Sequence, residues 1–253
     1  ISLLLALTLA LSGCGQAEST EDTWSDAVRI EFSDDSVTVD GNAASADSAV
    51  YTENDIIFYL EGQGVTYGEG TEADAHSQAE ADAHTVVHIT QPGTYVLSGE
   101  LSAGQIAVDL GEGAETDPEA VVTLVLDGVD ITCTVAPAVM FYRVYECGST
   151  DGDAASWEVD TSAAGANIMI ADGTENTIRG SYVARIYDPE SVTLSEDGTE
   201  VEDAKKLHKY DGSFYSRMSM NVSGGAAGTG VLNIYGENEG LDTELHLTIQ
   251  SGV

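Results

Sequence analysis

Short runs of β-branched and aliphatic residues, each closed by Gly, Asp or Asn, recur through most of this chain. No convincing amphipathic helical pattern interrupts them between residues 85 and 253. Strand runs of about four to eight residues with frequent turns are typical of all-β proteins. The sequence therefore predicts an all-β fold. The runs lie at residues 86–89, 94–98, 105–110, 121–131, 166–171, 230–234 and 245–249.

The composition of these runs selects among all-β architectures. The core must be built from Val, Ile, Leu and Ala, because the chain has only 4 Phe and 2 Trp. Asp-Gly closes the runs at residues 127–128 and 172–173, as polar turns with unusual backbone angles require. Coils that stack directly over one another need such aliphatic ladders and such turns. We therefore predict a right-handed parallel β-helix, a solenoid, over residues 85–253.

Acidic insertions break the period of these coils, and their composition predicts loops that project from the solenoid. The insertions occupy residues 112–120, 149–162 and 188–206. Residues 28–84 precede the solenoid and are expected to form an N-terminal β segment. Its predicted strands lie at residues 28–32, 36–41 and 56–60. Its acidic, Ala-rich stretch, residues 68–84, is either a short helix or a loose loop.

The first residues have the features of an export signal. Residues 1–11 are almost purely apolar, too short to span a bilayer but typical of a signal peptide. The sequence Leu11-Ser12-Gly13-Cys14 resembles a bacterial lipoprotein box, which implies cleavage before Cys14 and acylation of its thiol. We expect residues 1–13 to be a signal peptide truncated at its start and residues 14–27 a lipidated tether. An ordinary signal peptide with an incidental Cys is the alternative.

The charge balance excludes two classes of partner. The chain has 8 Lys+Arg against 44 Asp+Glu, a formal net charge of -36. A nucleic-acid binder needs a basic face, which eight scattered cations do not make. An anionic membrane surface would repel the body of the protein. We therefore expect no nucleic-acid partner and a lipid anchor as the only membrane contact, on the extracellular face of a bacterial cell membrane.

Two cysteines remain, Cys133 and Cys147. In an exported protein they could form a disulfide. They could equally be two buried thiols, since Cys often behaves as a small apolar residue. The sequence leaves both possibilities open.

Five motifs follow one another in a fixed order over about half the chain, at residues 89–99, 104–109, 124–131, 173–177 and 211–216. Together they resemble a bacterial family usually called carbohydrate-binding domain-containing proteins. The resemblance implies an exported, often lipidated protein with a parallel β-helix like that of pectate lyases. It also implies calcium on the helix and binding of plant polysaccharides, cellulose and acidic pectic chains among them. Members usually continue with further coils, so we expect truncation at the C-terminus as well.

Carboxylates clustered on turns are candidate calcium ligands, because Ca²⁺ takes about six to eight oxygen ligands. No EF-hand spacing is present, and a solvated acidic surface is the alternative for each residue. Bound calcium would also let so acidic a body meet an acidic glycan. The candidates are Asp127 with Asp130, Asp172 with Glu175, and the turn residues Glu237, Glu239 and Asp242.

Tyrosines are the candidate sugar-binding residues, because Trp occurs only at positions 24 and 157. Residues 141–145 alternate, so one face carries Tyr142 and Val144 and the other Phe141, Arg143 and Tyr145. One of these faces is expected to point inwards. Local packing with a satisfied hydroxyl is the alternative for each ring. The predicted sugar-binding set is Tyr142, Tyr145, Tyr187, Tyr210 and Tyr215.

A transition-metal site is a further possibility at His76, His84 and His88, beside Glu80 and Asp82. The acidic, Ala-rich stretch offers no rigid frame for such a site. The sequence therefore favours solvated or packed histidines.

The function predicted is non-catalytic, calcium-assisted binding of cellulose- or pectin-type polysaccharide at the cell surface. A polysaccharide lyase or hydrolase on the same scaffold is the first alternative, and a surface adhesin or structural stalk the second. Neither Arg179 nor Arg185 lies in a recognisable lyase motif, and no pair of acids stands out for hydrolysis. Residues 211–215 lack the second Gly of a nucleophile elbow. No catalytic residue is predicted.

Overall fold

The computed structural model describes residues 24–154 and 156–251 of the 253-residue chain. Strands dominate it, and the described residues contain a single α-helix, α1 (Gln78–Ala81). The prediction of an all-β protein is confirmed. The predicted signal peptide and the lipidation site Cys14 lie outside the described residues. No helix in the described part of the chain is long and apolar enough to cross a membrane.

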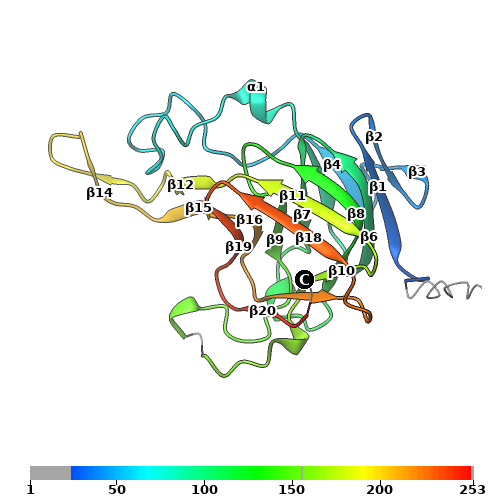
Figure 1. Cartoon of the computed structure of the whole chain (residues 1–253). Helices are drawn as coiled ribbons and strands as arrows, with labels where there is room; N and C mark the ends of the chain where they lie inside the picture. The colour runs from blue at the N-terminus through cyan, green and yellow to red at the C-terminus, as the bar shows by residue number, and fades with distance from the viewer. Residues whose placement is uncertain (1–23, 155, 252–253) are drawn as a thin grey trace, which may run out of the picture.

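Two large sheets carry the fold (Figure 1). The first sheet has the order β20-β17-β10-β8-β6-β1-β2-β3, with β11 pairing to β8 and β18. Its strands are β1 (Val28–Ser33), β2 (Ser36–Val39), β3 (Asn42–Ala43), β6 (Gly93–Leu101), β8 (Val122–Thr132), β10 (Ala166–Ile170), β11 (Glu175–Gly180), β17 (Met220–Gly224), β18 (Val231–Gly236) and β20 (Leu247–Ile249). The second sheet has the order β19-β16-β9-β7-β5-β4. Its strands are β4 (Val50–Glu53), β5 (Thr85–Ile89), β7 (Gly104–Asp109), β9 (Val139–Arg143), β16 (Gly212–Ser216) and β19 (Glu239–Thr243).

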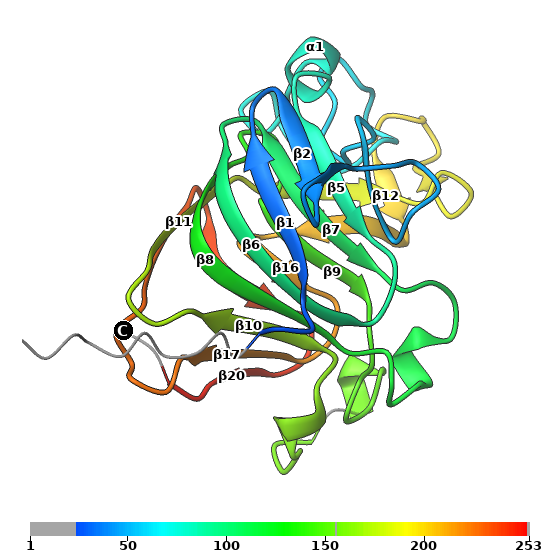
Figure 2. The ribbon, with the colours of Figure 1, turned by 90° about the vertical axis from the view of Figure 1, so that its right-hand side faces the viewer.

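From β5 onward the chain passes repeatedly between the two sheets. In the second sheet β5, β7, β9, β16 and β19 pair in parallel in that order. In the first sheet β6, β8, β10, β17 and β20 do the same. Figure 2 shows β1, β6 and β8 side by side at one end of this arrangement. Each circuit of the chain thus adds one strand to the second sheet and one or two to the first, where β11 and β18 follow β10 and β17.

This pairing places like residues over like in the interior. Leu97, Leu126 and Ile170 follow one another in register across β6, β8 and β10. Ile106 and Val139 do the same across β7 and β9. All five are at most 3% exposed. Burial of these aliphatic ladders is the main stabilising contribution, since each such side chain gains about 1.5–3 kcal/mol by leaving water.

Antiparallel pairs occur in the N-terminal strands of both sheets, so each sheet contains parallel and antiparallel pairs. Antiparallel pairs also form within one insertion. β1–β2, β2–β3 and β4–β5 are antiparallel. Between β11 and β16, β12 (Val183–Tyr187) pairs antiparallel with β15 (Lys206–Tyr210). The connecting residues contain β13 (Thr193–Leu194) and β14 (Val201–Asp203) and project away from the sheets (Figure 1).

The strand predicted at residues 56–60 is wrong. Ile56 and Tyr59 are buried, yet the run joins no sheet and makes only an isolated bridge between Leu60 and His76. Its apolar side chains are buried by packing rather than by pairing in a ladder. The Ala-rich stretch that follows contains α1, whose N-cap Ser77 accepts a hydrogen bond from the amide of Glu80 at 3.2 Å.

Cys133 and Cys147 are both free thiols. Cys133 is buried, and burial raises the pKa of its thiol to about 12. Such a thiol is a small apolar core residue rather than a reactive group. The structure thus favours free thiols over a disulfide, with Cys133 buried and Cys147 only partly buried.

Candidate functional site

The outer face of the second sheet is covered by other parts of the chain, and the candidate site lies under this cover. Side chains alternate between the two faces of a strand. In β5, Val87 and Ile89 are fully buried in the interior, so Val86 and His88 point outwards. In β7 the outward residues include Asp109. β15 and the irregular segment around residue 57 approach this face and enclose two cavities with it.

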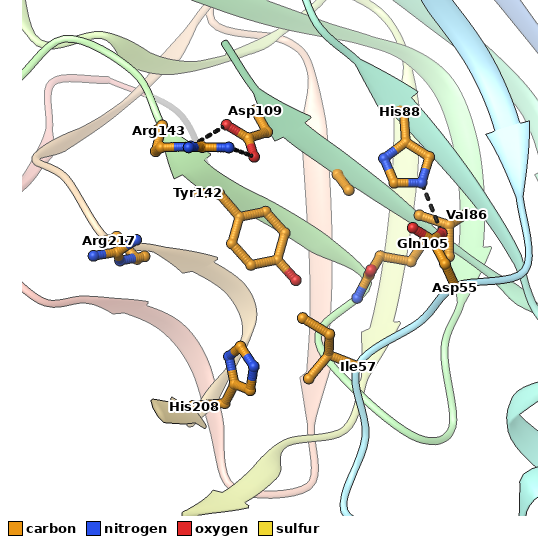
Figure 3. Close-up of a pocket in the computed structure, with 11 residues that line it drawn as sticks. Asp55, Ile57, Val86, His88, Gln105, Asp109, Tyr142, Arg143, His208 and Arg217 are labelled. Carbon is orange, nitrogen blue, oxygen red and sulfur yellow. Dashed lines mark hydrogen bonds and ion pairs between the residues drawn. The ribbon is translucent and has the colours of Figure 1, made fainter. Parts of the chain in front are cut away.

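The first cavity, here named the histidine pocket, has a volume of about 350 Å³ (Figure 3). It is lined by Asp55, Ile57, Val86, His88, Gln105, Ala107, Asp109, Tyr142, Arg143, His208 and Arg217. The second, here named the lysine pocket, has a volume of about 370 Å³. It is lined by Tyr142, Asp188, Lys205, Lys206, Leu207, His208, Lys209, Tyr210, Tyr215, Arg217 and Glu244. Three residues line both cavities, so the two adjoin: Tyr142, His208 and Arg217.

An irregularity in β9 turns two consecutive side chains towards the histidine pocket. The register moves from Val108 opposite Phe141 to Asp109 opposite Arg143, so one residue of β9 is left unpaired. Such a bulge breaks the alternation of faces. Tyr142 and Arg143 consequently both line the pocket, and the prediction that they lie on opposite faces is wrong.

Arg143 is held by Asp109. Its Nε and Nη2 each donate a hydrogen bond of 2.6 Å to the two carboxylate oxygens of Asp109 (Figure 3). The carboxylate raises the pKa of the guanidinium above its usual value. A bidentate pair of this kind fixes the geometry of both side chains. It leaves the histidine pocket with a rigid polar wall.

Three of the predicted sugar-binding tyrosines come together beside the pockets. The rings of Tyr142 and Tyr210 meet edge to face at 6.0 Å between centroids, and those of Tyr210 and Tyr215 at 4.8 Å. Tyr210 is 3% and Tyr215 1% exposed, so their ring faces are covered by protein. Burial raises the pKa of Tyr210 to about 12. Of the three, only Tyr142 is partly exposed, so it is the ring that a ligand in the pockets could touch.

The other two predicted tyrosines lie elsewhere. Tyr187, on β12, is 9% exposed and donates a hydrogen bond of 3.1 Å to Glu69. Tyr145 follows β9 and lines neither pocket. Two exposed rings are absent from the predicted set, Trp157 at 101% and Tyr235 at 58%. Exposure depends on long-range packing, and no local sequence signal distinguishes these rings from the buried ones.

The lysine pocket collects positive charge in a strongly acidic chain. It is lined by four cations and two acids, although the whole chain has 8 Lys+Arg against 44 Asp+Glu. Every lysine of the chain lines it. Lys206 pairs with Glu244 at 2.7 Å, and Lys209 with Asp211 at 2.6 Å. Within the described part of the chain, Lys205 and Arg217 form no ion pair.

His208 lies between the two pockets and is neutral at pH 7. Burial and the charge of Arg217 lower the pKa of its imidazole. Its Nδ1 shares a hydrogen bond of 2.6 Å with the Tyr210 hydroxyl. The ring is therefore a fixed polar group of the wall rather than a further cation.

Three of the predicted calcium ligands, Asp130, Asp172 and Glu175, have protein partners instead of one another. Asp130 pairs with Arg179 at 2.6 Å. Asp172 accepts hydrogen bonds from the amides of residues 227 and 229, which lower its pKa. Glu175 accepts from Asn233 at 3.1 Å, while Asp127 is exposed at the turn after the first half of β8. Neither pair belongs to a group of three described side chains whose ligand atoms lie within 4.8 Å of one another.

The third predicted group is more crowded with acids. Burial raises the pKa of Asp242, and so do the charges of Glu239 and Asp211. Glu237 instead accepts a hydrogen bond from the Ser181 hydroxyl. No three of the predicted ligands, here or in the other groups, have their ligand atoms within 4.8 Å of one another.

One other group of three meets that distance within the described residues: Glu53, Asp55 and His88. The remaining histidines considered from the sequence are packed or paired. His84 is 2% exposed and hydrogen-bonds to the amide of Thr134. His76 pairs with Glu80 at 3.3 Å.

Comparisons with known proteins identify the family of this chain. A model of carbohydrate-binding domain-containing proteins matches residues 83–253. The chain belongs to this family. It is 28% identical over 166 residues to a carbohydrate-binding domain-containing protein of Acetivibrio thermocellus. No solved structure matches.

The matched stretch of this carbohydrate-binding domain-containing protein begins two residues before β5 and includes every strand that pairs in parallel from there on. The alignment with the Acetivibrio protein covers 66% of this chain and 43% of the relative, so the chain spans less than half of that protein's length. Most of the residues of the two pockets lie inside the family match, whereas Asp55 and Ile57 precede it.

Proposed function

We propose that this protein binds acidic, pectin-type polysaccharide without catalysis, and that the lysine pocket holds a carboxylate of the sugar chain. The observation that carries the proposal is the concentration of the chain's lysines and Arg217 at one cavity. A chain of net charge -36 repels an anionic glycan except where positive charge is gathered locally. The family's name supports carbohydrate as the ligand.

The polar groups around the pockets suit a sugar. Arg217 and Lys205, which form no ion pair in the described part of the chain, are donors for a carboxylate. The ring of Tyr142, which is partly exposed and lines both pockets, adds an aromatic edge. A pocket with a few fixed polar groups beside apolar surface is typical of small-ligand and sugar sites.

The proposal has three further parts: a calcium ion, a lipid anchor and the type of fold. We propose that calcium assists binding at the turn around Asp242, where Asp211 and Glu239 crowd together. We propose a lipid anchor at Cys14 that holds the protein on the outer face of a bacterial membrane, with the sequence of residues 11–14 as its support. We propose that the parallel circuits of the two sheets form a right-handed β-helix, supported by their strand pairing.

The test compares polygalacturonate with a soluble cellulose derivative by isothermal titration calorimetry. The double substitution Lys205→Ala with Arg217→Ala is expected to weaken polygalacturonate binding by about tenfold, because each exposed ion pair contributes up to about 1 kcal/mol. The matched control is Arg179→Ala, which removes a cation that pairs with Asp130 and lines neither pocket. Its affinity is expected to equal that of the native protein.

Each other outcome decides against a stated part of the proposal. Equal affinity of the double variant and the native protein would remove the lysine pocket as the carboxylate site. Polygalacturonate binding that is unchanged in the presence of a chelator would exclude a role for calcium. Unsaturated products, seen as ultraviolet absorbance, would establish the lyase alternative. A folded protein that binds neither glycan would favour the adhesin.

A further inference from the structure

We infer that Glu53, Asp55 and His88 form a binding site for a divalent transition-metal ion, with Zn²⁺ as the reference ion. Ligand atoms of these three side chains lie within 4.8 Å of one another, a spacing that one ion can bridge. The inference does not depend on the proposed glycan.

Strand pairing brings these side chains together from positions far apart in the chain. β4 and β5 are antiparallel, with Tyr51 opposite His88 and Glu53 opposite Val86. Glu53 is thus the diagonal neighbour of His88 on the same outward face, within reach of a long side chain. Asp55 follows two residues later, where β4 has ended. The histidine is supplied by the sheet and the two carboxylates by the end of its edge strand.

The imidazole of His88 is already oriented. Its ring stacks on that of Tyr51, with 4.6 Å between centroids and 12° between planes. Its Nε2 shares a hydrogen bond of 2.8 Å with Oδ1 of Asp55 (Figure 3). Metal-binding histidines are commonly fixed by such contacts before the ion arrives. His88 is 15% and Asp55 50% exposed, so an ion can enter from solvent.

The distances between ligand atoms that a bound ion requires are close to those already present in the structure. Two ligand atoms at about 2.0–2.1 Å from a tetrahedral ion lie about 3.4 Å apart. The 2.8 Å between His88 and Asp55 must therefore widen by only about half an ångström. A nitrogen that binds a metal carries no proton, so the imidazole binds through Nε2 as the tautomer with its proton on Nδ1. The fourth position is left for water or a ligand hydroxyl.

The chemistry of the donors selects the ion. One imidazole nitrogen with two carboxylates suits Zn²⁺ and its neighbours, whereas Ca²⁺ prefers oxygen ligands alone. The site lies at the edge of the histidine pocket, which Asp55 and His88 help to line.

The experiment is calorimetric titration of Zn²⁺ into the untagged full chain at physiological ionic strength, with Ca²⁺ in excess to saturate unspecific acidic sites. One Zn²⁺ per chain is expected. His88→Gln, Asp55→Asn and Glu53→Gln are each expected to weaken binding by at least about tenfold. The matched control is His76→Gln, which breaks a histidine–carboxylate pair that has no third ligand. It is expected to bind Zn²⁺ as the native protein does.

Two results would overturn the site. One is the lack of saturable Zn²⁺ binding by the native chain. The other is equal Zn²⁺ affinity of the native chain and all three ligand variants. Because Glu53 and Asp55 are exposed, their amide variants are expected to keep the native circular dichroism spectrum, so a loss of affinity reports on the ligands.

Discussion

Single side chains join the circuits of this protein where the backbone turns. Asn176 is fully buried in β11, between β8 and β18. Its Oδ1 accepts hydrogen bonds from the amides of Gly128 at 2.8 Å and Val129 at 3.0 Å. Its Nδ2 donates to Thr174 Oγ1 at 2.9 Å and to the carbonyl of Val231 at 3.1 Å. One amide side chain thus satisfies backbone groups of both neighbouring circuits.

Replacement of Asn176 by Ala is expected to lower the free energy of unfolding by about 2–3 kcal/mol. Two backbone amides would lose their acceptor, and that of Val129 is buried. Each such loss costs about 1–3 kcal/mol where the amide is shielded from water. Urea denaturation measures the change. The control Asn238→Ala removes an exposed side chain with one long bond of 3.4 Å to Asp211, and is expected to stay within about 0.5 kcal/mol of the native protein. Equal stability of the two variants would contradict this role of Asn176.

The sequence predicts the roles of such polar and aromatic residues only in part. It places Asn176 in a family motif but gives it no structural role, because the amides that it binds belong to strands about fifty residues away. It selects Tyr142, which lines both pockets, together with Tyr210 and Tyr215, which are buried. A sequence gives the type of each residue, whereas the exposure of its side chain depends on which distant segments of the chain pack over it. The lysine pocket was missed for the same reason, although its lysines stand together in the sequence.

At the scale of elements, the close approach of β1 and β6 depends on Gly99. Its φ is 95°, and a Cβ there would collide with the carbonyl oxygen of Phe32 on β1. Gly128, at the turn within β8, has a similar φ of 82° but open space where a Cβ would stand. Both positions require a positive φ, but only Gly99 also lacks the space for a Cβ atom.

Gly128→Ala is expected to cost about 1 kcal/mol, the strain of a left-handed conformation in an L residue. Gly99→Ala is expected to cost at least about 2 kcal/mol more, because β1 must move away from β6 as well. Thermal unfolding followed by circular dichroism measures both. A Gly99 variant no less stable than the Gly128 variant would show that β1 adapts without loss.

Elements within the repeated circuits were the most predictable. β5, β7, β8 and β10 coincide with aliphatic runs, because their inward ladders require branched apolar residues. The segment at residues 56–60 has the same texture but covers a sheet instead of joining one. β12 and β15 form a hairpin across the insertion at residues 188–206, whose acidic composition indicated only a loop. β15 of this hairpin lines the lysine pocket together with residues of β9 and β16, so the local pattern could not reveal the site.

At the scale of the whole molecule, charge opposes folding. A net charge of -36 on 253 residues destabilises the compact state by self-repulsion. Added salt screens this repulsion, with a Debye length of about 10 Å at 0.1 M ionic strength. The melting temperature is therefore expected to rise from low salt to physiological NaCl. A melting temperature that falls with NaCl would mean that the ion pairs at the pockets outweigh the general repulsion.

Calcium separates screening from specific binding. An ion that binds the folded state at defined sites stabilises it by mass action, in addition to any screening. If the crowded acids around Asp242 take up calcium, CaCl₂ raises the melting temperature above that in NaCl of equal ionic strength. Asp242→Asn is expected to reduce this excess while leaving the NaCl response unchanged, because one charge in 44 acids barely alters the repulsion. Identical melting temperatures in the two salts at equal ionic strength would leave screening as the whole effect and exclude calcium from the folded protein.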